Sequence, residues 1–219
     1  MTATPTARPT ATSVRDPRTR LLLSGSVAAV GVFGVVSLTQ AATREGFDLT
    51  RFPLSALSNG DLGWVQITNF VVSGVLAVAG AVGLHRVMRG TPGGTWAPRL
   101  VAVWGIGLIL SGPFVLQGGG GFPVGDPGVP GMTVGTIGHL VVGTVAFAAL
   151  IASCFVLGRH YARSGERGMA LGSRASGSAF LVGDLYSMAG GPAGALVLAI
   201  TALTAMAWVG VVAHVELRR

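Results

Sequence analysis

The chain has 219 residues, of which 50% are hydrophobic and only 11% are charged. A soluble domain carries about twice that share of charged residues, so the composition excludes an ordinary soluble protein. The net charge of +7 comes from arginines at the ends of apolar runs and not from a continuous basic face, which argues against nucleic acid as a partner.

Residues 1–20 are rich in Thr, Pro and Arg and contain almost nothing to bury, so they are predicted to form a disordered cytoplasmic tail. Six apolar runs follow, each long enough to cross a hydrocarbon core of about 30 Å as a helix. These runs cover residues 21–41, 64–88, 97–117, 134–158, 169–189 and 192–215. The chain is therefore predicted to be an all-α membrane protein, a six-transmembrane-helix bundle over residues 21–217.

The first run has an alternative interpretation as a signal peptide, because a basic tail precedes it and small residues surround Ala41. The run is longer than the usual apolar core of a signal peptide, and its removal would leave an odd number of spans. We therefore predict that it is retained as the first span.

The arginines predict the orientation. Thirteen of the fifteen lie in the N-terminal tail, in the second and fourth connectors and at the C-terminus, whereas only Arg44 and Arg51 lie in the first connector. Arginine-rich connectors stay in the cytoplasm. Both termini are thus predicted to be cytoplasmic, in a bacterial plasma membrane, with the connectors at 42–63 and 118–133 outside.

The outer stretch RFPLSALSNGDLGW, residues 51–64, differs from the apolar runs on either side of it. Asn59-Gly60 is a turn dipeptide. Phe52, Leu54 and Leu57 would each forgo about 1.5–3 kcal/mol by staying in water. The stretch is therefore predicted to fold back over the outer end of the bundle as a short helical turn, and not to form a free loop.

The third run contains Pro113, which removes a backbone hydrogen bond and should bend or end the helix there. The outer connector that follows, GGGGFPVGDPGVPG at 118–131, has no lysine of the kind a phosphate-binding loop needs and no preceding strand. A glycine-rich turn is therefore predicted for it.

Three stretches carry a resemblance: PLSALSNGDLGWVQITNF, then FPVGDP, then TVGTIGHL at the start of a span. Their order and the six-span layout, over about residues 20–217, resemble a bacterial membrane family known as domain of unknown function 998. The resemblance implies the fold and the membrane location. It implies no activity, ligand or catalytic residue.

Two ionisable residues lie inside predicted spans, where such residues are costly and mark candidate functional sites. His139 and Asp184 each lie about five residues from the outer end of their span, which is roughly 7–8 Å below the outer interface at 1.5 Å per residue. Asn69 reaches the same depth on the second span, and Gln66 lies one turn above it. These depths predict an outward-facing polar pocket.

The predicted pocket has a lining and a mouth. The lining candidates are Gln66, Asn69, His139, Asp184 and Asp61, and the candidates at the mouth are Ser55, Ser58 and Asp126. The alternative for Gln66, Asn69 and the nearby Ser73 is interhelical hydrogen bonding, which contributes about 0.6 kcal/mol per contact in membrane bundles.

Three function classes follow. We favour a non-enzymatic bundle of unknown molecular function with an outward-facing polar pocket. The first alternative is a membrane-embedded hydrolase or lipid-modifying enzyme, with His139 as base, Asp184 or Asp126 orienting it, and Ser55 or Ser58 as nucleophile. The second alternative is a small-solute or proton-coupled transporter in which Asp184 titrates.

No metal site and no cofactor are predicted, because the lone Cys154 lies in an apolar run and no Cys/His ligand pattern occurs. The predicted partners are the lipid bilayer and a lipid or small-molecule ligand at the outer face.

Overall fold

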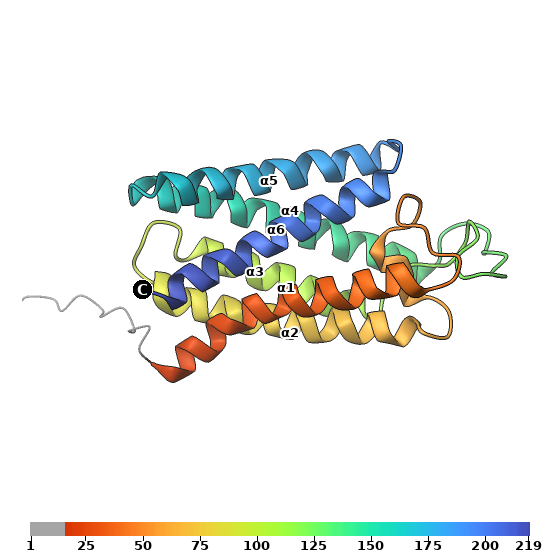
Figure 1. Cartoon of the computed structure of the whole chain (residues 1–219), viewed down its shortest axis with the longest axis horizontal. Helices are drawn as coiled ribbons and strands as arrows, with labels where there is room; N and C mark the ends of the chain where they lie inside the picture. Colours follow the sequence, from red (N-terminus) through yellow and green to blue (C-terminus); the bar gives the residue numbers. More distant parts are fainter. Residues whose placement is uncertain (1–15) are drawn as a thin grey trace, which may run out of the picture.

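The computed structural model describes residues 16–219, which form six α-helices and one short 3-10 helix (Figure 1). The α-helices are α1 (Pro17–Thr43), α2 (Gly63–Met88), α3 (Trp96–Ser111), α4 (Val134–Arg163), α5 (Arg167–Met188) and α6 (Gly194–Leu217), and the 3-10 helix is η1 (Leu54–Ser58). The predicted all-α architecture is confirmed. The predicted disordered tail at 1–20 falls largely outside the described residues, and its last residues belong to α1, which Asp16 caps by accepting from the backbone N–H of Arg18.

The six helices form a closed ring in chain order. Each helix packs against the next along the chain, and α6 packs against α1 to close the ring. Residues 44–62, 112–133 and 189–193 lie at one end of the bundle, which we call the connector end. The C-terminus and residues 89–95 and 164–166 lie at the other end, which we call the terminal end (Figure 1).

Four of the helices, α1, α2, α4 and α6, are long and apolar enough to cross a membrane. The helix α3 is apolar but has only 16 residues, or about 24 Å at 1.5 Å per residue, and it ends at Ser111 instead of continuing to residue 117. Pro113 accounts for this end, as predicted, because it has no N–H for the helical ladder. The helix α5 is 22 residues long but carries Arg174 and Asp184.

Glycine allows the closest helix contacts. A Cβ built on Gly80 of α2 would lie 2.6 Å from the backbone N of Ser26 on α1. Between α2 and α3, a Cβ on Gly105 would lie 3.0 Å from the carbonyl oxygen of Gly74. Small residues let helix backbones approach in membranes, where packing contributes much of the association energy. These positions hold α1, α2 and α3 together as one wall of the ring.

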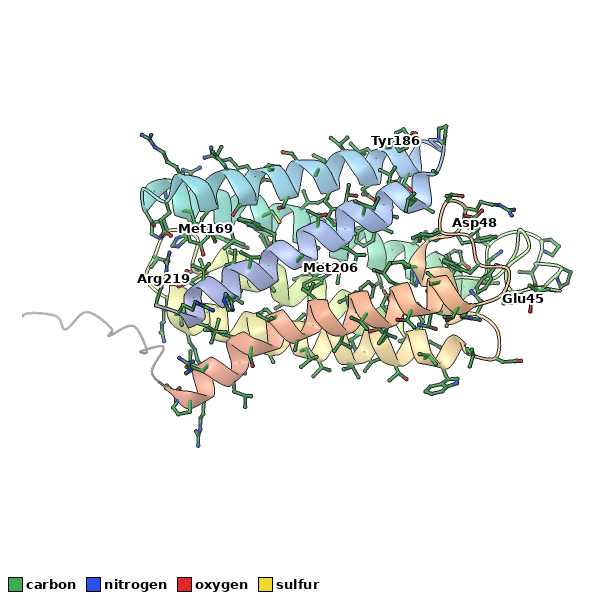
Figure 2. All side chains as sticks on the ribbon, in the orientation of Figure 1. Glu45, Asp48, Met169, Tyr186, Met206 and Arg219 are labelled. Atoms are coloured by element: carbon green, nitrogen blue, oxygen red, sulfur yellow. The ribbon has the colours of Figure 1, made fainter. Side chains whose placement is uncertain are left out.

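A polar cluster joins α4 to the C-terminus at the terminal end. The buried Tyr161 hydroxyl donates to Glu216 Oε1 at 3.0 Å, and Arg219 pairs with Glu216 at 3.1 Å and with Glu166. The Arg219 guanidinium also lies 5.8 Å from the Tyr161 ring centroid. Figure 2 shows Arg219 at this end and Glu45 and Asp48 at the opposite one. The cluster therefore ties α4 and the start of α5 to the C-terminal residues at the terminal end.

Candidate functional site

The stretch 51–64 folds back onto the bundle, as predicted. Its centre is η1, in which Leu54 is buried and Leu57 has no exposed surface at all. Phe52 is half-buried and packs against the core. Gly60 has φ = +72°, a left-handed conformation that glycine adopts without strain, and it forms the predicted bend. The stretch therefore covers the connector end of the ring, and we call residues 51–64 the cover segment.

Arg44 fixes this cover in place. Its guanidinium donates to the carbonyl oxygens of Leu57 at 2.5 Å and Asn59 at 2.6 Å, and it lies 4.8 Å from the ring centroid of Phe122. Partial burial lowers the pKa of Arg44, and the nearby Asp61 carboxylate opposes this effect. An arginine stays charged under such conditions. The position of Arg44 in the sequence indicates only the orientation of the chain, and no sequence pattern predicted its role as an anchor.

The glycine-rich connector packs on the same cover. Phe122 is buried and meets the ring of Phe47 edge-on at a centroid distance of 5.1 Å and the ring of Phe52 at 5.7 Å. Asn59 donates from its side-chain amide to the carbonyl oxygen of Leu116 at 2.7 Å. Contacts of this kind, made by segments far apart in sequence, hold the two long connectors as one cap.

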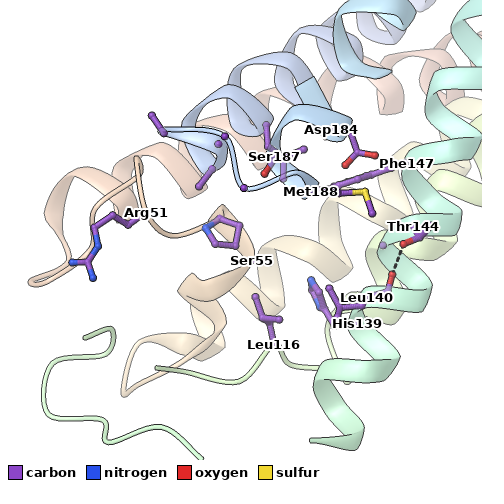
Figure 3. A pocket seen from close by; sticks show the side chains of 18 of the residues that line it. Arg51, Ser55, Leu116, His139, Leu140, Thr144, Phe147, Asp184, Ser187 and Met188 are labelled. Carbon is purple, nitrogen blue, oxygen red and sulfur yellow. Dashed lines mark hydrogen bonds between the residues drawn. The ribbon is translucent and has the colours of Figure 1, made fainter. Parts of the chain in front are cut away.

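A cavity of about 450 Å³ opens beside this cap, and we call it the connector-end cavity. Its wall is formed by α4, by the α5–α6 hairpin, by the cover segment and by Leu116. Its polar lining residues are Thr50, Arg51, Ser55, His139, Thr144, Asp184 and Ser187. Its larger apolar lining residues are Pro53, Leu116, Leu140, Phe147, Met188 and Leu198 (Figure 3).

A narrower space of about 90 Å³, the inner cavity, adjoins the connector-end cavity inside the bundle. Pro53, Ser55, His139, Gly143 and Phe147 are among the residues that line both spaces. All six helices contribute to the inner cavity, and its deeper lining includes the apolar side chains Trp104, Leu150 and Met206. The polar side chains of the site therefore lie mainly around the connector-end cavity, and the inner cavity is mainly apolar.

The course of α6 explains why the space exists. In Figure 1, α6 crosses the bundle diagonally, from the side of α5 at the connector end towards α1 at the terminal end. The short turn between α5 and α6 sets this start, with Gly190 and Ala193 both at positive φ, 73° and 53°. At the connector end η1 packs against α1 and α2, and Pro53 and Ser55 of the cover segment line the cavity beside it.

His139 lines both cavities, but it does not pair with Asp184. Its Nδ1 lies 2.7 Å from the carbonyl oxygen of Phe114, in the extended segment that follows α3. A carbonyl oxygen only accepts, so Nδ1 carries the proton, and Nε2 of the neutral ring is left as an acceptor. The contact ties α4 to the segment that Pro113 releases from the helix.

Gly135, His139 and Gly143 follow one another at four-residue intervals and form one stripe of α4, but the two glycines have different neighbours. A Cβ on Gly135 would lie 2.9 Å from the carbonyl oxygen of Val115, so this glycine allows close packing of the extended segment. A Cβ on Gly143 would meet nothing within 4 Å, because this glycine lines the cavities. The stripe therefore marks a packing contact at one end and open space at the other.

Asp184 is half-buried in the wall of the connector-end cavity. Within residues 16–219 its carboxylate makes no hydrogen bond and no ion pair. In the view of Figure 3, Phe147 and Met188 lie between Asp184 and His139. The cavity thus brings the two predicted residues to one site but does not bring them into contact.

Gln66 and Asn69 lie in the interface between α1 and α2 and do not line either cavity. Gln66 accepts from the side-chain amide of Gln40 at 2.9 Å, and Asn69 donates to Ser37 Oγ at 3.0 Å. Ser73 donates to Asn69 Oδ1 at 3.2 Å. Gln66 and Asn69 are both buried, so their geometry agrees with the alternative prediction of interhelical hydrogen bonding.

The four remaining candidate residues lie in different places in the structure. Ser55 lines both cavities, whereas Ser58 is buried and its hydroxyl has no partner within residues 16–219. Asp126 Oδ1 accepts from the backbone N–H of Gly128 at 2.8 Å, which fixes a turn in the glycine-rich connector. Asp61 is exposed near Arg44. Neither carboxylate lines the connector-end cavity.

Three of the candidate residues share a cavity without forming a catalytic triad. Ser55, His139 and Asp184 share one cavity, but no hydrogen bond links any two of them, and the Phe114 carbonyl holds the ring nitrogen that a triad carboxylate would orient. Within residues 16–219 no three His, Cys, Asp or Glu side chains cluster as a metal site would require.

Comparison with known families shows to which family the chain belongs. The model of a family described as a protein of unknown function, DUF998, matches residues 27–215, which are most of the chain. The chain belongs to the DUF998 family. No curated protein and no solved structure matches it. The resemblance drawn from the sequence is thereby confirmed, and membership in DUF998 supplies no activity.

Proposed function

We propose that this DUF998 protein is a non-enzymatic membrane protein that binds an amphipathic molecule in its connector-end cavity. One observation carries the proposal: a cavity of about 450 Å³, with charged and polar side chains in its wall, adjoins an apolar space lined by all six helices. Ligand sites have volumes of about 300–1,000 Å³, mostly apolar walls and few polar groups. A head group would occupy the mouth, and a chain would enter the inner cavity.

The proposal includes six spans, cytoplasmic termini and a connector end that faces outward from the plasma membrane. Thirteen arginines lie in segments assigned to the cytoplasm and two in the first connector, which supports this orientation. Trp64 begins α2 at the connector end and Trp96 begins α3 at the terminal end, and their side chains are 63% and 62% exposed. Tryptophan is enriched at both membrane interfaces.

The enzyme and transporter alternatives have less support. A hydrolase would need a serine in contact with its base, and Ser55 makes no hydrogen bond to His139. A transporter would need a path to the other side, and the two cavities extend only to residues such as Trp104, Leu150 and Met206.

Trp104 provides a direct test because it lines the inner cavity and is almost fully buried. The protein is placed in phosphatidylcholine nanodiscs after the other three tryptophans have been replaced by phenylalanine. Dodecanol brominated at the end of its chain is then added as the probe. We expect the bromine to quench Trp104 fluorescence saturably, because the chain enters the inner cavity.

Gly143→Leu should abolish this quenching, since the new side chain would fill the space beside His139. Gly31→Leu is the matched control: Gly31 also has nothing within 4 Å of a built Cβ, but it lies on the exposed face of α1. Absence of quenching in the parent protein, or equal quenching in both variants, would overturn the proposal.

A further inference from the structure

The charges in the connector-end cavity specify the ligand further. Apart from His139, the only ionisable lining residues are Arg51 and Asp184. Arg51 is exposed, donates to the carbonyl oxygen of Gly120 at 2.9 Å, and lies 5.1 Å from the ring centroid of Phe52. In Figure 3 its guanidinium points away from Asp184. The positive charge at the mouth is therefore already used to hold the cap.

Asp184 is in the opposite situation. It is half-buried on α5, it lines the cavity, and it has no ion-pair or hydrogen-bond partner among residues 16–219. A carboxylate in a membrane helix is costly unless a charged or polar group compensates it. The missing compensation can come from a ligand, because the carboxylate borders space that a ligand can fill.

The surroundings of Asp184 favour a cation that carries an apolar chain. Phe147 and Met188 lie next to the carboxylate in Figure 3, and Leu198 continues the apolar wall. The Phe147 ring is held edge-on by Phe180 at a centroid distance of 5.0 Å. Aromatic faces and carboxylates together recognise ammonium groups.

We propose that the ligand is a cationic amphiphile of the membrane, with an amine or quaternary ammonium group paired to Asp184 and its chain in the inner cavity. This inference rests on the proposed function, because it names the class of molecule that the same cavity binds. The Nε2 acceptor of His139 adds a second group that accepts hydrogen bonds from an amine and repels no cation.

Three probes with one tetradecyl chain test the head group: tetradecyltrimethylammonium, tetradecanol and tetradecyl sulfate. Each competes with the brominated alcohol for Trp104 in nanodiscs, and its concentration in the bilayer is measured on empty nanodiscs. We expect the ammonium probe to bind about tenfold tighter than the alcohol, and the sulfate to bind weakest, because the Asp184 carboxylate attracts the cation by charge and repels the anion. Tetramethylammonium, which lacks the chain, should not compete.

Asp184→Asn should remove the preference for the ammonium probe without removing alcohol binding, and Asp184→Glu should keep the preference. Equal affinity for all three head groups, or a preference that survives Asp184→Asn, overturns the inference and leaves the proposed function standing. Competition by tetramethylammonium at similar concentrations overturns the amphiphile class in favour of a small solute. If the brominated alcohol itself fails to quench Trp104, the proposed function fails.

Discussion

Arg44 illustrates how one side chain can hold two connectors. Its planar guanidinium reaches two carbonyl oxygens on the cover segment and the face of Phe122 on the glycine-rich connector. Lysine has a single point charge and cannot reproduce this planar set of contacts. The geometry therefore makes Arg44→Lys a severe change, although it keeps the charge.

We predict that Arg44→Lys increases the opening of the cover segment. Loss of a charged hydrogen bond costs about 1.5–3 kcal/mol, so the open population should rise roughly tenfold or more. The reporter is Ser58→Cys in a Cys154→Ala background, because Ser58 is only 6% exposed in the closed state. Arg163→Lys is the control, since Arg163 is exposed at the end of α4, at the terminal end of the bundle. Equal thiol reactivity in both variants would contradict the anchoring role.

Asn69 distinguishes interhelical bonding from ligand binding. It bonds Ser37 on α1 and accepts from Ser73, and it lines neither cavity. We predict that Asn69→Ala lowers the free energy of unfolding by about 0.6–2 kcal/mol and leaves quenching of Trp104 by the brominated alcohol unchanged. The neighbouring Thr68 is exposed, so Thr68→Ala should alter neither quantity. A loss of quenching with unchanged stability would return Asn69 to the binding site.

Close packing at the level of helices depends on a few glycines. Gly80 faces the backbone of Ser26, so an added methyl group cannot be accommodated by rotation of a side chain. We predict that Gly80→Ala destabilises the protein by about 1–3 kcal/mol through overpacking. Gly31→Ala, at an open position of α1, should stabilise it by up to about 1 kcal/mol because alanine favours helix. Unfolding in a denaturing detergent series measures both, and an equal response would contradict the packing argument.

Helices and their ends could be predicted from the sequence more accurately than the contacts between side chains. Pro113 has a local effect on the helical ladder, so the end of α3 could be predicted from residue types alone. The same holds for η1, whose apolar residues and turn dipeptide are contiguous in the chain. The partner of His139 could not be predicted from its depth, because the extended segment after α3 supplies the Phe114 carbonyl that meets it.

Asn69 is a second residue whose contacts could not be predicted from its depth in the membrane. Its depth matches that of His139, but the rotation of α2 within the ring turns it towards Ser37 on α1. Periodicity identifies a helix face, whereas the direction of that face depends on which helix packs beside it. The ring order of the helices, with α6 against α1, supplies this information for the whole molecule.

At the scale of the molecule, the ring and the tilt of α6 produce an asymmetric bundle. The terminal end carries the polar cluster of Tyr161, Glu216 and Arg219, and the connector end carries a cap beside which a cavity opens. Because neighbouring helices run in opposite directions, three connector-end segments must lie on one side of the membrane if all six helices cross it.

This condition gives a topology test that treats α3 and α5 separately from the four longer helices. Single cysteines in a Cys154→Ala background replace exposed residues at both ends: Glu45, Val129 and Ala189 at the connector end, and Thr95 and Ser164 at the terminal end. We predict that a membrane-impermeant maleimide applied to intact cells labels the first three and spares the other two, because thirteen of fifteen arginines lie in segments assigned to the cytoplasm.

Each departure from that pattern identifies a different error. Labelling of only Thr95 and Ser164 would reverse the orientation. Labelling of Glu45 without Val129 would mean that α3, with 16 residues, does not cross, since a helix of about 24 Å is shorter than a hydrocarbon core of about 30 Å. Protection of Ala189 together with Ser164 would mean that α5 lies along the membrane surface. Permeabilised cells supply the control, because all five cysteines are exposed and should then react.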